Sequence, residues 1–411
     1  MAEVILFLYR LLTGVMVWPL ALALKNHPNF ESTLAQRLSL NLPDPPSGRP
    51  LIWVHAASVG EVKAIAALMK SIRHHHPGCF VFLTCMTSTG MTVARQDAVA
   101  DRVFPFPFDT YRSMKRLMLR LHPKVILVAE TEIWPNMLCA AADLDIPLVY
   151  VNARMSLSAF GRYRKIAVVM KRLLRDVRVL AITREDAARF SQLEAKHVEV
   201  MGNLKLDAIA EADPAGIADL RAELGIGSRP VFIAGSTREG EEDFVIEAIV
   251  RAREQIRDLF TIIVPRHPDR VELARTLASR QGMDAVLRSS KEQPSELLVV
   301  DTMGELFSFF GISDVAFVGG SLVDLGGQNI LEPISWGVPT IHGPYMDNFS
   351  WALEVVSGHT VVVKTADELA GAIMEILQGT RFNDLGQGAR EALSAAGGVT
   401  DRYVSALAPY L

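Results

Sequence analysis

The chain has 411 residues and half of them are hydrophobic, so it is long enough for more than one domain with a sizeable core. Its net charge is −4, but residues 1–210 carry 26 Lys and Arg against 17 Asp and Glu, and the remainder carries 16 against 29. We expect no nucleic-acid partner; the basic half suits an anionic membrane surface or a phosphorylated substrate. Cys79, Cys85 and Cys139 lack metal-site spacing and are odd in number, which favours buried thiols in a reducing compartment.

The first 24 residues are nearly all apolar. Arg10 interrupts them and leaves 14 uninterrupted residues after it, which is short for a full membrane span. A signal peptide would need a basic start, but Glu3 precedes any basic residue. We therefore predict that residues 1–24 form a retained membrane anchor, either a tilted helix or one lying in the interface, with Trp18 at the headgroup level.

From residue 50 onward, apolar β-rich runs alternate with helical patterns, which is typical of an α/β protein with doubly wound parallel sheets. The first set of runs lies at residues 51–54, 80–84, 103–108, 125–129, 148–152 and 179–183. After a break near residues 202–214, a second set lies at residues 231–234, 261–264, 297–300, 315–318, 339–342 and 361–363. We predict two Rossmann-like domains, residues 25–210 and 211–411, that face a cleft and bind ligands at the carboxyl ends of their strands.

Glu61 ends the stretch HAASVGE, which directly follows the first predicted strand. Ser58 and Glu61 have the spacing of a capping box, so Glu61 could serve only to start a helix. Ala56, Ala57 and Gly60, however, leave room for a ligand at the strand end, and capping does not explain that room. Helix capping and general-base catalysis are therefore both open for Glu61.

A second acidic loop, ETEIWPN at residues 130–136, follows the predicted strand at 125–129. Its carboxylates, Glu130 and Glu132, would face the same cleft. The alternative is that they supply negative charge to the start of a helix whose first turn contains Pro135.

A basic run follows the predicted strand at 148–152. It could bind lipid headgroups or an acceptor phosphate, or it could be a solvated helix face. Its members are Arg162, Arg164, Lys165, Lys171, Arg172, Arg175 and Arg178.

In the second half, Gly235, Ser236 and Thr237 lie where a strand meets a helix, and backbone N–H groups there could hold a phosphate. The competing interpretation is a capping box formed by Ser236 and Glu239. In PRHPDR, residues 265–270, the basic side chains could bind phosphate or could be surface charges on a turn.

The glycine-rich stretch GGSLVDLGGQNILEP, residues 319–333, leads from a strand to a helix predicted to start near Asn329. Gly319, Gly320 and Ser321 would let a phosphate approach the backbone, and Glu332 could accept hydrogen bonds from ribose hydroxyls. We reject a metal site at Asp143-Leu-Asp145, which precedes a strand and so lies at the opposite edge of the sheet.

Together these motifs resemble the 3-deoxy-D-manno-octulosonic acid (Kdo) transferases of lipopolysaccharide synthesis. The resemblance covers most of the chain after about residue 30 and depends on order and spacing more than on any single motif. The motifs are ASVGE (57–61), ETEIWPN (130–136), NARMS (152–156), GNLKLD (202–207), PRHPDR (265–270) and GGSLVDLGGQNILEP (319–333).

The resemblance implies a GT-B fold, an acceptor-binding N-terminal domain and a C-terminal domain that binds the CMP-sugar. It implies Kdo transfer from CMP-Kdo to the phosphorylated lipid A precursor at the cytoplasmic face of the inner membrane, next to anionic lipid. Glu61 would be the general base, while Glu130 and Lys205 would stabilise the transition state. The residues expected to contact CMP are Pro265, Arg266, Met303, Gly304, Glu305, Asn329, Ile330, Leu331 and Glu332.

The expected reaction inverts the sugar configuration and requires no cofactor or metal, because a monophosphate leaving group needs less help than a diphosphate. Two alternatives stay open: a nucleotide-sugar epimerase of the same fold, and a membrane-tethered nucleotide-binding protein without catalysis. An epimerase would not need the apolar first 24 residues, and two glutamates in a roomy cleft argue against a protein without catalysis.

Overall fold

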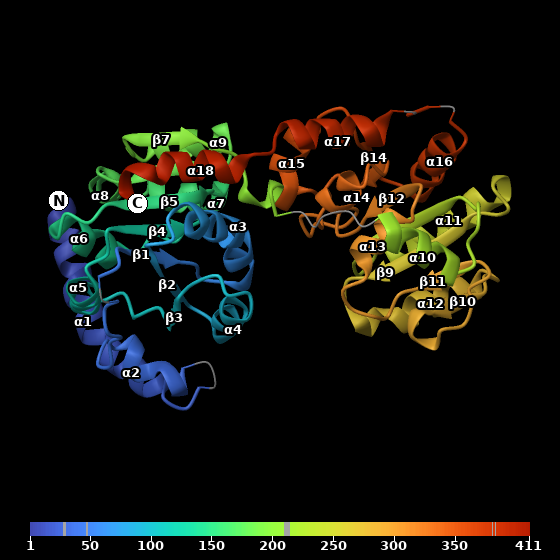
Figure 1. The fold of residues 1–411 in the computed structure, drawn as a ribbon. Helices are drawn as coiled ribbons and strands as arrows, with labels where there is room; N and C mark the ends of the chain where they lie inside the picture. Colours follow the sequence, from blue (N-terminus) through green and yellow to red (C-terminus); the bar gives the residue numbers. More distant parts are fainter. Residues whose placement is uncertain (28–29, 47, 209–213, 380, 383) are drawn as a thin grey trace. The chain divides into compact units, whose positions relative to one another are not determined.

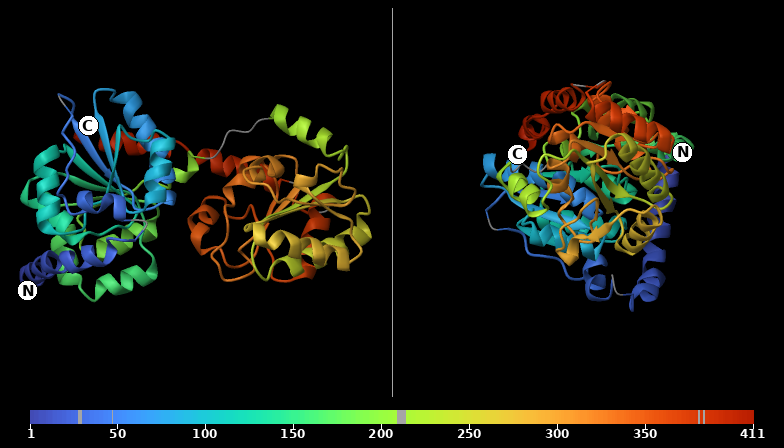
Figure 2. Two further views of the ribbon diagram at one scale, coloured as in Figure 1. Left: turned by 90° about the horizontal axis from the view of Figure 1, so that it is seen from below. Right: turned by 90° about the vertical axis from the view of Figure 1, so that its right-hand side faces the viewer.

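The computed structural model describes residues 1–27, 30–46, 48–208, 214–379, 381–382 and 384–411. The chain divides into two compact units: unit 1 comprises Met1–Ala208 and Gly398–Leu411, and unit 2 comprises Ile209–Gly397. In each unit helices cover both faces of a parallel sheet (Figures 1 and 2). The predicted α/β class with two doubly wound sheets is therefore confirmed.

The sheet of unit 1 has seven parallel strands in the order β3-β2-β1-β4-β5-β6-β7. Its strands are β1 (Leu51–His55), β2 (Phe80–Cys85), β3 (Arg102–Pro105), β4 (Val125–Ala129), β5 (Leu148–Ala153), β6 (Arg178–Ala181) and β7 (His197–Val200). The strand order reverses between β1 and β4, and such a reversal opens a crevice at the carboxyl ends of the strands. The loops that follow β1 and β4 are HAASVGE and ETEIWPN, so the fold brings the two acidic loops to this point.

Helices of unit 1 form a layer on each face of the sheet. One layer contains α3 (Val59–His75), α4 (Ser88–Gln96) and α18 (Val399–Leu407), and the other contains α5 (Tyr111–Leu121), α6 (Pro135–Asp143) and α8 (Ala167–Leu174). The first helix, α1 (Ala2–Leu24), contacts α5 and α8. The remaining helices are the short α2 (Leu34–Arg37), α7 (Leu157–Arg164) and α9 (Arg184–Gln192).

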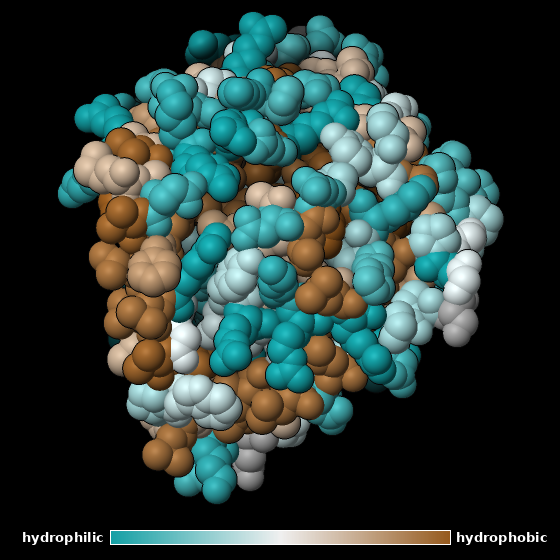
Figure 3. Space-filling model, turned by 90° about the vertical axis from the view of Figure 1, so that its left-hand side faces the viewer, coloured by the Kyte–Doolittle hydropathy of each residue, from teal (hydrophilic) through white to brown (hydrophobic). Residues whose placement is uncertain are grey.

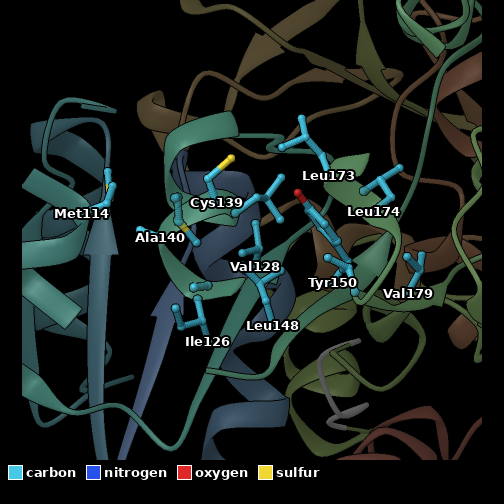
Figure 4. Packing of buried hydrophobic residues seen from close by; sticks show 14 of the residues in the cluster. Met114, Ile126, Val128, Cys139, Ala140, Leu148, Tyr150, Leu173, Leu174 and Val179 are labelled. Carbon is cyan, nitrogen blue, oxygen red and sulfur yellow. The ribbon is translucent and has the colours of Figure 1, made fainter. Parts of the chain in front are cut away.

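One hydrophobic core of unit 1 lies between the sheet and the second helical layer (Figure 4). Side chains of β4 and β5, including Val128 and Tyr150, pack against Cys139 of α6 and Leu173 of α8. All three cysteines are buried and free, which confirms the prediction of buried thiols.

The last segment of the chain, Gly398–Leu411, belongs to unit 1, although we had expected the second domain to run to residue 411. Tyr403 of α18 is fully buried, and its hydroxyl accepts the Asn152 N–H at 3.1 Å and lies 3.2 Å from the Gly202 carbonyl. The apolar stripe of α18 fits any open sheet face, so its sequence pattern does not specify which sheet it covers.

The sheet of unit 2 also has seven parallel strands, in the order β10-β11-β9-β8-β12-β13-β14. Its strands are β8 (Val231–Thr237), β9 (Phe260–Pro265), β10 (Ala285–Leu287), β11 (Leu297–Val299), β12 (Val315–Val318), β13 (Thr340–His342) and β14 (Val361–Val362). Its helices are α10 (Pro214–Glu223), α11 (Glu242–Gln255), α12 (Val271–Arg280), α13 (Leu306–Gly311), α14 (Leu331–Ser335), α15 (Ser350–Val355), α16 (Ala366–Leu377) and α17 (Leu385–Ala395). The order reverses between β8 and β12, so the loops after these strands meet at the expected ligand position.

Candidate active site

Glu61 lies in the first turn of α3, at the carboxyl end of β1. Ser58 caps this helix, accepting the Glu61 N–H at 3.3 Å and donating its hydroxyl to Glu61 Oε1 at 3.0 Å. The Ala57 N–H donates to Glu61 Oε2 at 2.7 Å. Glu61 therefore takes part in the cap of α3, as the capping interpretation predicts. The same contacts fix the orientation of its carboxylate.

Glu61 is 9% exposed. Burial raises the pKa of Glu61 to about 7, the charges of Glu130 and Glu132 add to that effect, and the hydrogen bonds from Ala57 and Ser58 oppose it. A carboxyl with a pKa near neutrality is suited to accept a proton at physiological pH.

Glu130 follows β4 and has a left-handed backbone conformation, with φ of +55°. Such a conformation is unfavourable for a residue with a Cβ and is concentrated at functional sites. The Glu130 carboxylate, itself buried, accepts a hydrogen bond from Arg154 Nε at 2.8 Å. Burial raises the pKa of Glu132, and the charge of Glu130 adds to this effect. The loop after β4 thus presents two carboxyl groups near Glu61.

Lys205 lies in the short helix η2 (Leu204–Leu206), which contacts α3, the helix that carries Glu61. Its backbone N–H donates to Asn203 Oδ1 at 3.0 Å. The residue before it, Leu204, donates its backbone N–H to the side-chain oxygen of Asn152 at 3.0 Å. The motifs NARMS and GNLKLD are therefore joined by a hydrogen bond, and both lie at the end of the sheet that carries Glu61.

Unit 2 contains a pocket of about 180 Å³ at the carboxyl ends of β8 and β12. Five residues predicted for the donor site line it, together with four others. The lining residues are Gly235, Ser236, Arg266, Leu306, Phe310, Val318, Gln328, Asn329 and Glu332. Burial raises the pKa of Glu332, whereas a hydrogen bond from Asn329 Nδ2 at 2.9 Å and the charge of Arg266 oppose that shift. The pocket thus combines a cation, a carboxyl and an amide.

Other residues expected to contact CMP do not line this pocket. Ile330 and Leu331 are buried in the interior, and Glu305 accepts hydrogen bonds from Arg288 at 3.0 and 3.2 Å. Met303 is 77% exposed and Gly304 has φ of +90°. Pro265 and Thr237 end strands β9 and β8, and the Thr237 carbonyl accepts the Arg266 N–H at 2.9 Å. Of these residues, Pro265, Thr237 and Glu305 are chain neighbours of the lining residues Arg266, Ser236 and Leu306.

Of the basic residues in PRHPDR, only Arg266 lines the pocket. Arg270 donates two hydrogen bonds to the buried carboxylate of Glu242, at 3.0 and 2.9 Å. His267 lies 3.0 Å from Arg238. The guanidinium of Arg270 is thus already engaged in a bidentate pair inside unit 2, which leaves Arg266 as the candidate for phosphate binding in this motif.

Glu241 holds the glycine loop in place, and the sequence pattern did not point to it. Its fully buried carboxylate accepts four backbone N–H groups: those of Arg238 and Gly320 at 2.8 and 2.6 Å, and those of Ser321 and Leu322, both at 2.9 Å. The N–H groups of Gly320 and Ser321 are consequently unavailable to a donor phosphate, contrary to our expectation.

The backbone around the glycine loop accounts for the glycine at position 319 and tests the capping box predicted at Ser236. A Cβ added to Gly319 would lie 2.4 Å from the Ser236 carbonyl oxygen, so this position admits glycine alone. Ser236 has φ of +57°, and α11 begins at Glu242 without a side-chain cap. The capping box proposed for Ser236 and Glu239 is therefore wrong.

Comparisons with known proteins decide the family. Residues 32–208 match the family model for 3-deoxy-D-manno-octulosonic-acid transferase (kdotransferase). The chain is 32% identical over 400 residues to the 3-deoxy-D-manno-octulosonic acid transferase of Haemophilus influenzae, which covers 93% of this chain and 92% of the relative. The enzyme of the same name from Bordetella pertussis is 33% identical over 384 residues, covering 88% and 87%. The chain belongs to the Kdo transferase family.

Solved structures agree on the fold of this Kdo transferase. The UDP-GlcNAc 2-epimerase of Neisseria meningitidis has a TM-score of 0.62 at 14% identity, covering 88% of this chain and 100% of that chain. A glycosyltransferase from Rickettsia africae has a TM-score of 0.61 at 12% identity, covering 88% and 98%. At such identities these neighbours show the fold alone, and that fold is GT-B. Family membership favours glycosyl transfer over the epimerase and non-catalytic alternatives.

Helix α1 of this Kdo transferase is long and apolar enough to cross a membrane. Its exposed apolar side chains form the brown ridge along the left edge of Figure 3. We call this surface the apolar ridge; it consists of Val4, Ile5, Phe7, Leu8, Leu11, Leu12, Val15, Met16, Trp18, Leu20 and Leu22.

The opposite face of α1 packs against unit 1. Leu6 is part of the core, and Glu3 pairs with Arg172 at 2.6 Å. Arg10, which interrupts the apolar sequence, lies over the Tyr111 ring and 3.7 Å from Asp143. These contacts make α1 an integral part of unit 1. They also occupy Asp143, the first carboxylate of the rejected metal motif, and no cluster of three metal-ligating side chains occurs among the described residues.

Proposed function

We propose that the protein transfers Kdo from CMP-Kdo to the lipid A precursor, lipid IVA, with inversion at the sugar. Membership in the Kdo transferase family supports Kdo transfer, and one structural observation carries the mechanism. Glu61 is a buried carboxyl at the carboxyl end of β1 with its pKa raised to about 7, oriented by hydrogen bonds from Ala57 and Ser58. It is therefore equipped to remove a proton from an acceptor hydroxyl.

In the proposed reaction, Glu61 takes the hydroxyl proton while the acceptor oxygen forms a bond to the ketosidic carbon of Kdo. The bond between that carbon and the CMP phosphate oxygen breaks on the opposite side, and its electron pair leaves with CMP. A single displacement inverts the configuration without a covalent sugar–enzyme intermediate. Arg266 and Lys205 would stabilise the negative charge that develops on the phosphate.

We assign CMP binding to unit 2 and acceptor binding to unit 1. In the pocket of unit 2, Arg266 would pair with the CMP phosphate, and the Glu332 carboxylate would accept hydrogen bonds from the ribose hydroxyls. Unit 1 carries Glu61, Glu130 and Glu132, together with the apolar ridge. We propose that the ridge lies in the cytoplasmic face of the inner membrane, where a lipid acceptor would be found.

The test is incubation of the purified full-length chain with CMP-Kdo and lipid IVA in detergent micelles, with products read by mass spectrometry. We expect a Kdo adduct, and we expect it to form equally well in excess EDTA, since no metal enters the proposed steps. Transfer that EDTA abolishes and Mg²⁺ restores would refute the metal-free mechanism. Hydrolysis of CMP-Kdo without an adduct, or turnover of UDP-GlcNAc instead, would refute the transfer itself.

A variant pair separates donor binding from the rest of the mechanism. Arg266→Ala should weaken CMP binding, because it removes the cation that lines the pocket. Arg257→Ala is a matched control, since Arg257 is outside the pocket lining. Equal CMP affinity in the two variants would contradict the assignment of the pocket to the donor.

A further inference from the structure

The first turn of α6 is held by a residue from another segment. Trp134 precedes the helix and makes no side-chain cap, so the free N–H groups of the first turn need another acceptor. Asp109, between β3 and α5, supplies it: Oδ2 accepts the Asn136 N–H at 3.1 Å and Oδ1 accepts the Met137 N–H at 2.9 Å. The Asn136 side chain donates back to the Asp109 carbonyl at 2.6 Å.

Helix α1 completes this arrangement with two hydroxyl groups. The Tyr9 hydroxyl donates to Asp109 Oδ2 at 3.2 Å, and the Asn136 side-chain amide donates to Thr13 Oγ1 at 3.0 Å. The Thr13 hydroxyl in turn donates to the Tyr9 carbonyl at 2.8 Å. Tyr9 and Thr13 are four residues apart, so they lie on one face of α1, away from the apolar ridge.

The loop that carries the acidic residues runs directly into this turn. Only Thr131, Glu132 and Ile133 separate Glu130 from Trp134, the residue that precedes α6. The Trp134 ring packs 5.2 Å from the ring of Phe106, and the Tyr150 hydroxyl donates to the Glu132 carbonyl at 3.1 Å. A displacement of the first turn of α6 would consequently move this loop.

We propose that Tyr9 and Thr13 are positioning residues for Kdo transfer, acting through Asp109 and Asn136 on the loop from Glu130 to Trp134. The membrane helix is then part of the catalytic unit and more than an attachment device. The inference rests on the proposed function, because the loop matters only if its carboxyl groups take part in transfer. It assigns to α1 a role that remains when the acceptor is supplied without a membrane.

The experiment compares full-length variants in detergent micelles at saturating acceptor, so that membrane capture does not limit the rate. Combined Tyr9→Phe and Thr13→Val removes both hydroxyls and keeps the side-chain volumes. We expect kcat to fall about tenfold or more, because small displacements of reacting groups are costly. The KM for CMP-Kdo should stay within about twofold, since donor binding belongs to unit 2.

Two matched variants distinguish positioning from general weakening of α1. Glu3→Gln removes the charge from the ion pair between α1 and Arg172 but has no link to Asp109, so its kcat should equal that of the wild type. Thr13→Ser keeps the hydroxyl and should also retain the wild-type kcat. If the double variant does not fold, as judged by thermal unfolding, Thr13→Val alone gives the same comparison.

The outcomes separate this inference from the proposed function. If the wild type fails to transfer Kdo, the proposed function is wrong. If the wild type transfers Kdo and the hydroxyl-free variant has the same kcat, the positioning role is wrong. A loss of kcat in Glu3→Gln as large as in the double variant would likewise overturn it, because any loosening of α1 would then suffice.

Discussion

Glu61 accepts a hydrogen bond from the backbone N–H of Ala57 at 2.7 Å, so the carboxylate that completes the cap of α3 is held facing the loop before that helix. Capping and catalysis, which compete as interpretations of the sequence, are compatible in the structure. The cap orients the carboxyl, and burial raises its pKa to about 7. A group that is both oriented and partly protonated near neutral pH has the properties of a general base.

Glu61→Gln should abolish most transfer while the fold is retained. The Gln side-chain oxygen can still accept one hydrogen bond, from Ala57 or Ser58, but the amide cannot take a proton. We expect kcat to fall about a hundredfold or more, with CMP affinity unchanged. Rate assays with calorimetry of CMP binding provide the measurement. Activity within a few-fold of the wild type, together with a lower melting temperature, would show that Glu61 only caps α3.

The raised pKa of Glu61 predicts opposite effects of pH on activity and on stability. Activity should rise as pH increases through about 7, because only the ionised carboxylate is a base. The folded state holds the Glu61 proton more tightly than the unfolded chain does, so this group's contribution to stability is greatest at low pH and is lost as pH rises to about 7. From pH 5 to pH 8, the melting temperature of the wild type should therefore fall relative to that of Glu61→Gln, because the Gln side chain does not titrate. Parallel curves would contradict the raised pKa.

Glu241 offers a test of the glycine loop. Glu241→Gln replaces an acceptor oxygen by an NH₂ group that faces N–H donors, so at least one buried N–H loses its partner at a cost of about 1–3 kcal/mol. We expect a lower melting temperature and about tenfold weaker CMP binding, because β8 and the loop after β12 line the pocket that we propose for the donor. Glu239→Gln, at a side chain that is 87% exposed, is the control. Unchanged CMP affinity in Glu241→Gln would show that the loop is rigid without this carboxylate.

The predicted apolar runs coincide with every strand of the two sheets except β7 and β10. The side chains of β7, HVEV, are mostly exposed, and β10 has one buried residue between two half-buried ones, so neither segment stands out as an apolar run. The positions of Glu61, Glu130 and Arg266 follow from a simpler rule. Glu130 and Arg266 come directly after strands of a parallel sheet, and Glu61 lies in the first turn of the helix that follows β1.

Long-range contacts were beyond the sequence analysis. Glu241 bonds to N–H groups 79 to 81 residues away, and the neighbouring sequence suggests only a helix start. Tyr403 contacts Asn152 from 251 residues away. The left-handed backbone of Glu130 is likewise set by its surroundings, because a Glu residue carries no local preference for that conformation.

The basic run from Arg162 to Arg178 divides into residues with an ion pair and residues without one in the described part of the chain. Four of its seven members form ion pairs: Lys171 with Glu194, Arg172 with Glu3, Arg175 with Asp176, and Arg178 with Glu199. Within the described part of the chain, no ion pair involves Arg162, Arg164 or Lys165. These three lie at the end of α7, before α8, and α8 contacts α1. We propose that these three charges, which have no ion-pair partner in the described part of the chain, are the ones that meet an anionic lipid surface.

Replacing Arg162, Arg164 and Lys165 by Gln should weaken binding to anionic vesicles at low salt and have little effect at high salt. Each basic residue near such a surface contributes about 1 kcal/mol, so the triple variant should lose up to about a hundredfold in affinity. Lys171→Gln, which removes a charge already paired with Glu194, is the matched control and should bind like the wild type. Leu8→Ser with Leu12→Ser, on the apolar ridge, should instead weaken binding at both salt concentrations, because apolar burial is not screened. Co-sedimentation with vesicles measures all four proteins. If the triple variant and Lys171→Gln bind equally well, the basic residues form only a solvated helix end, and the apolar ridge alone holds the protein at the membrane.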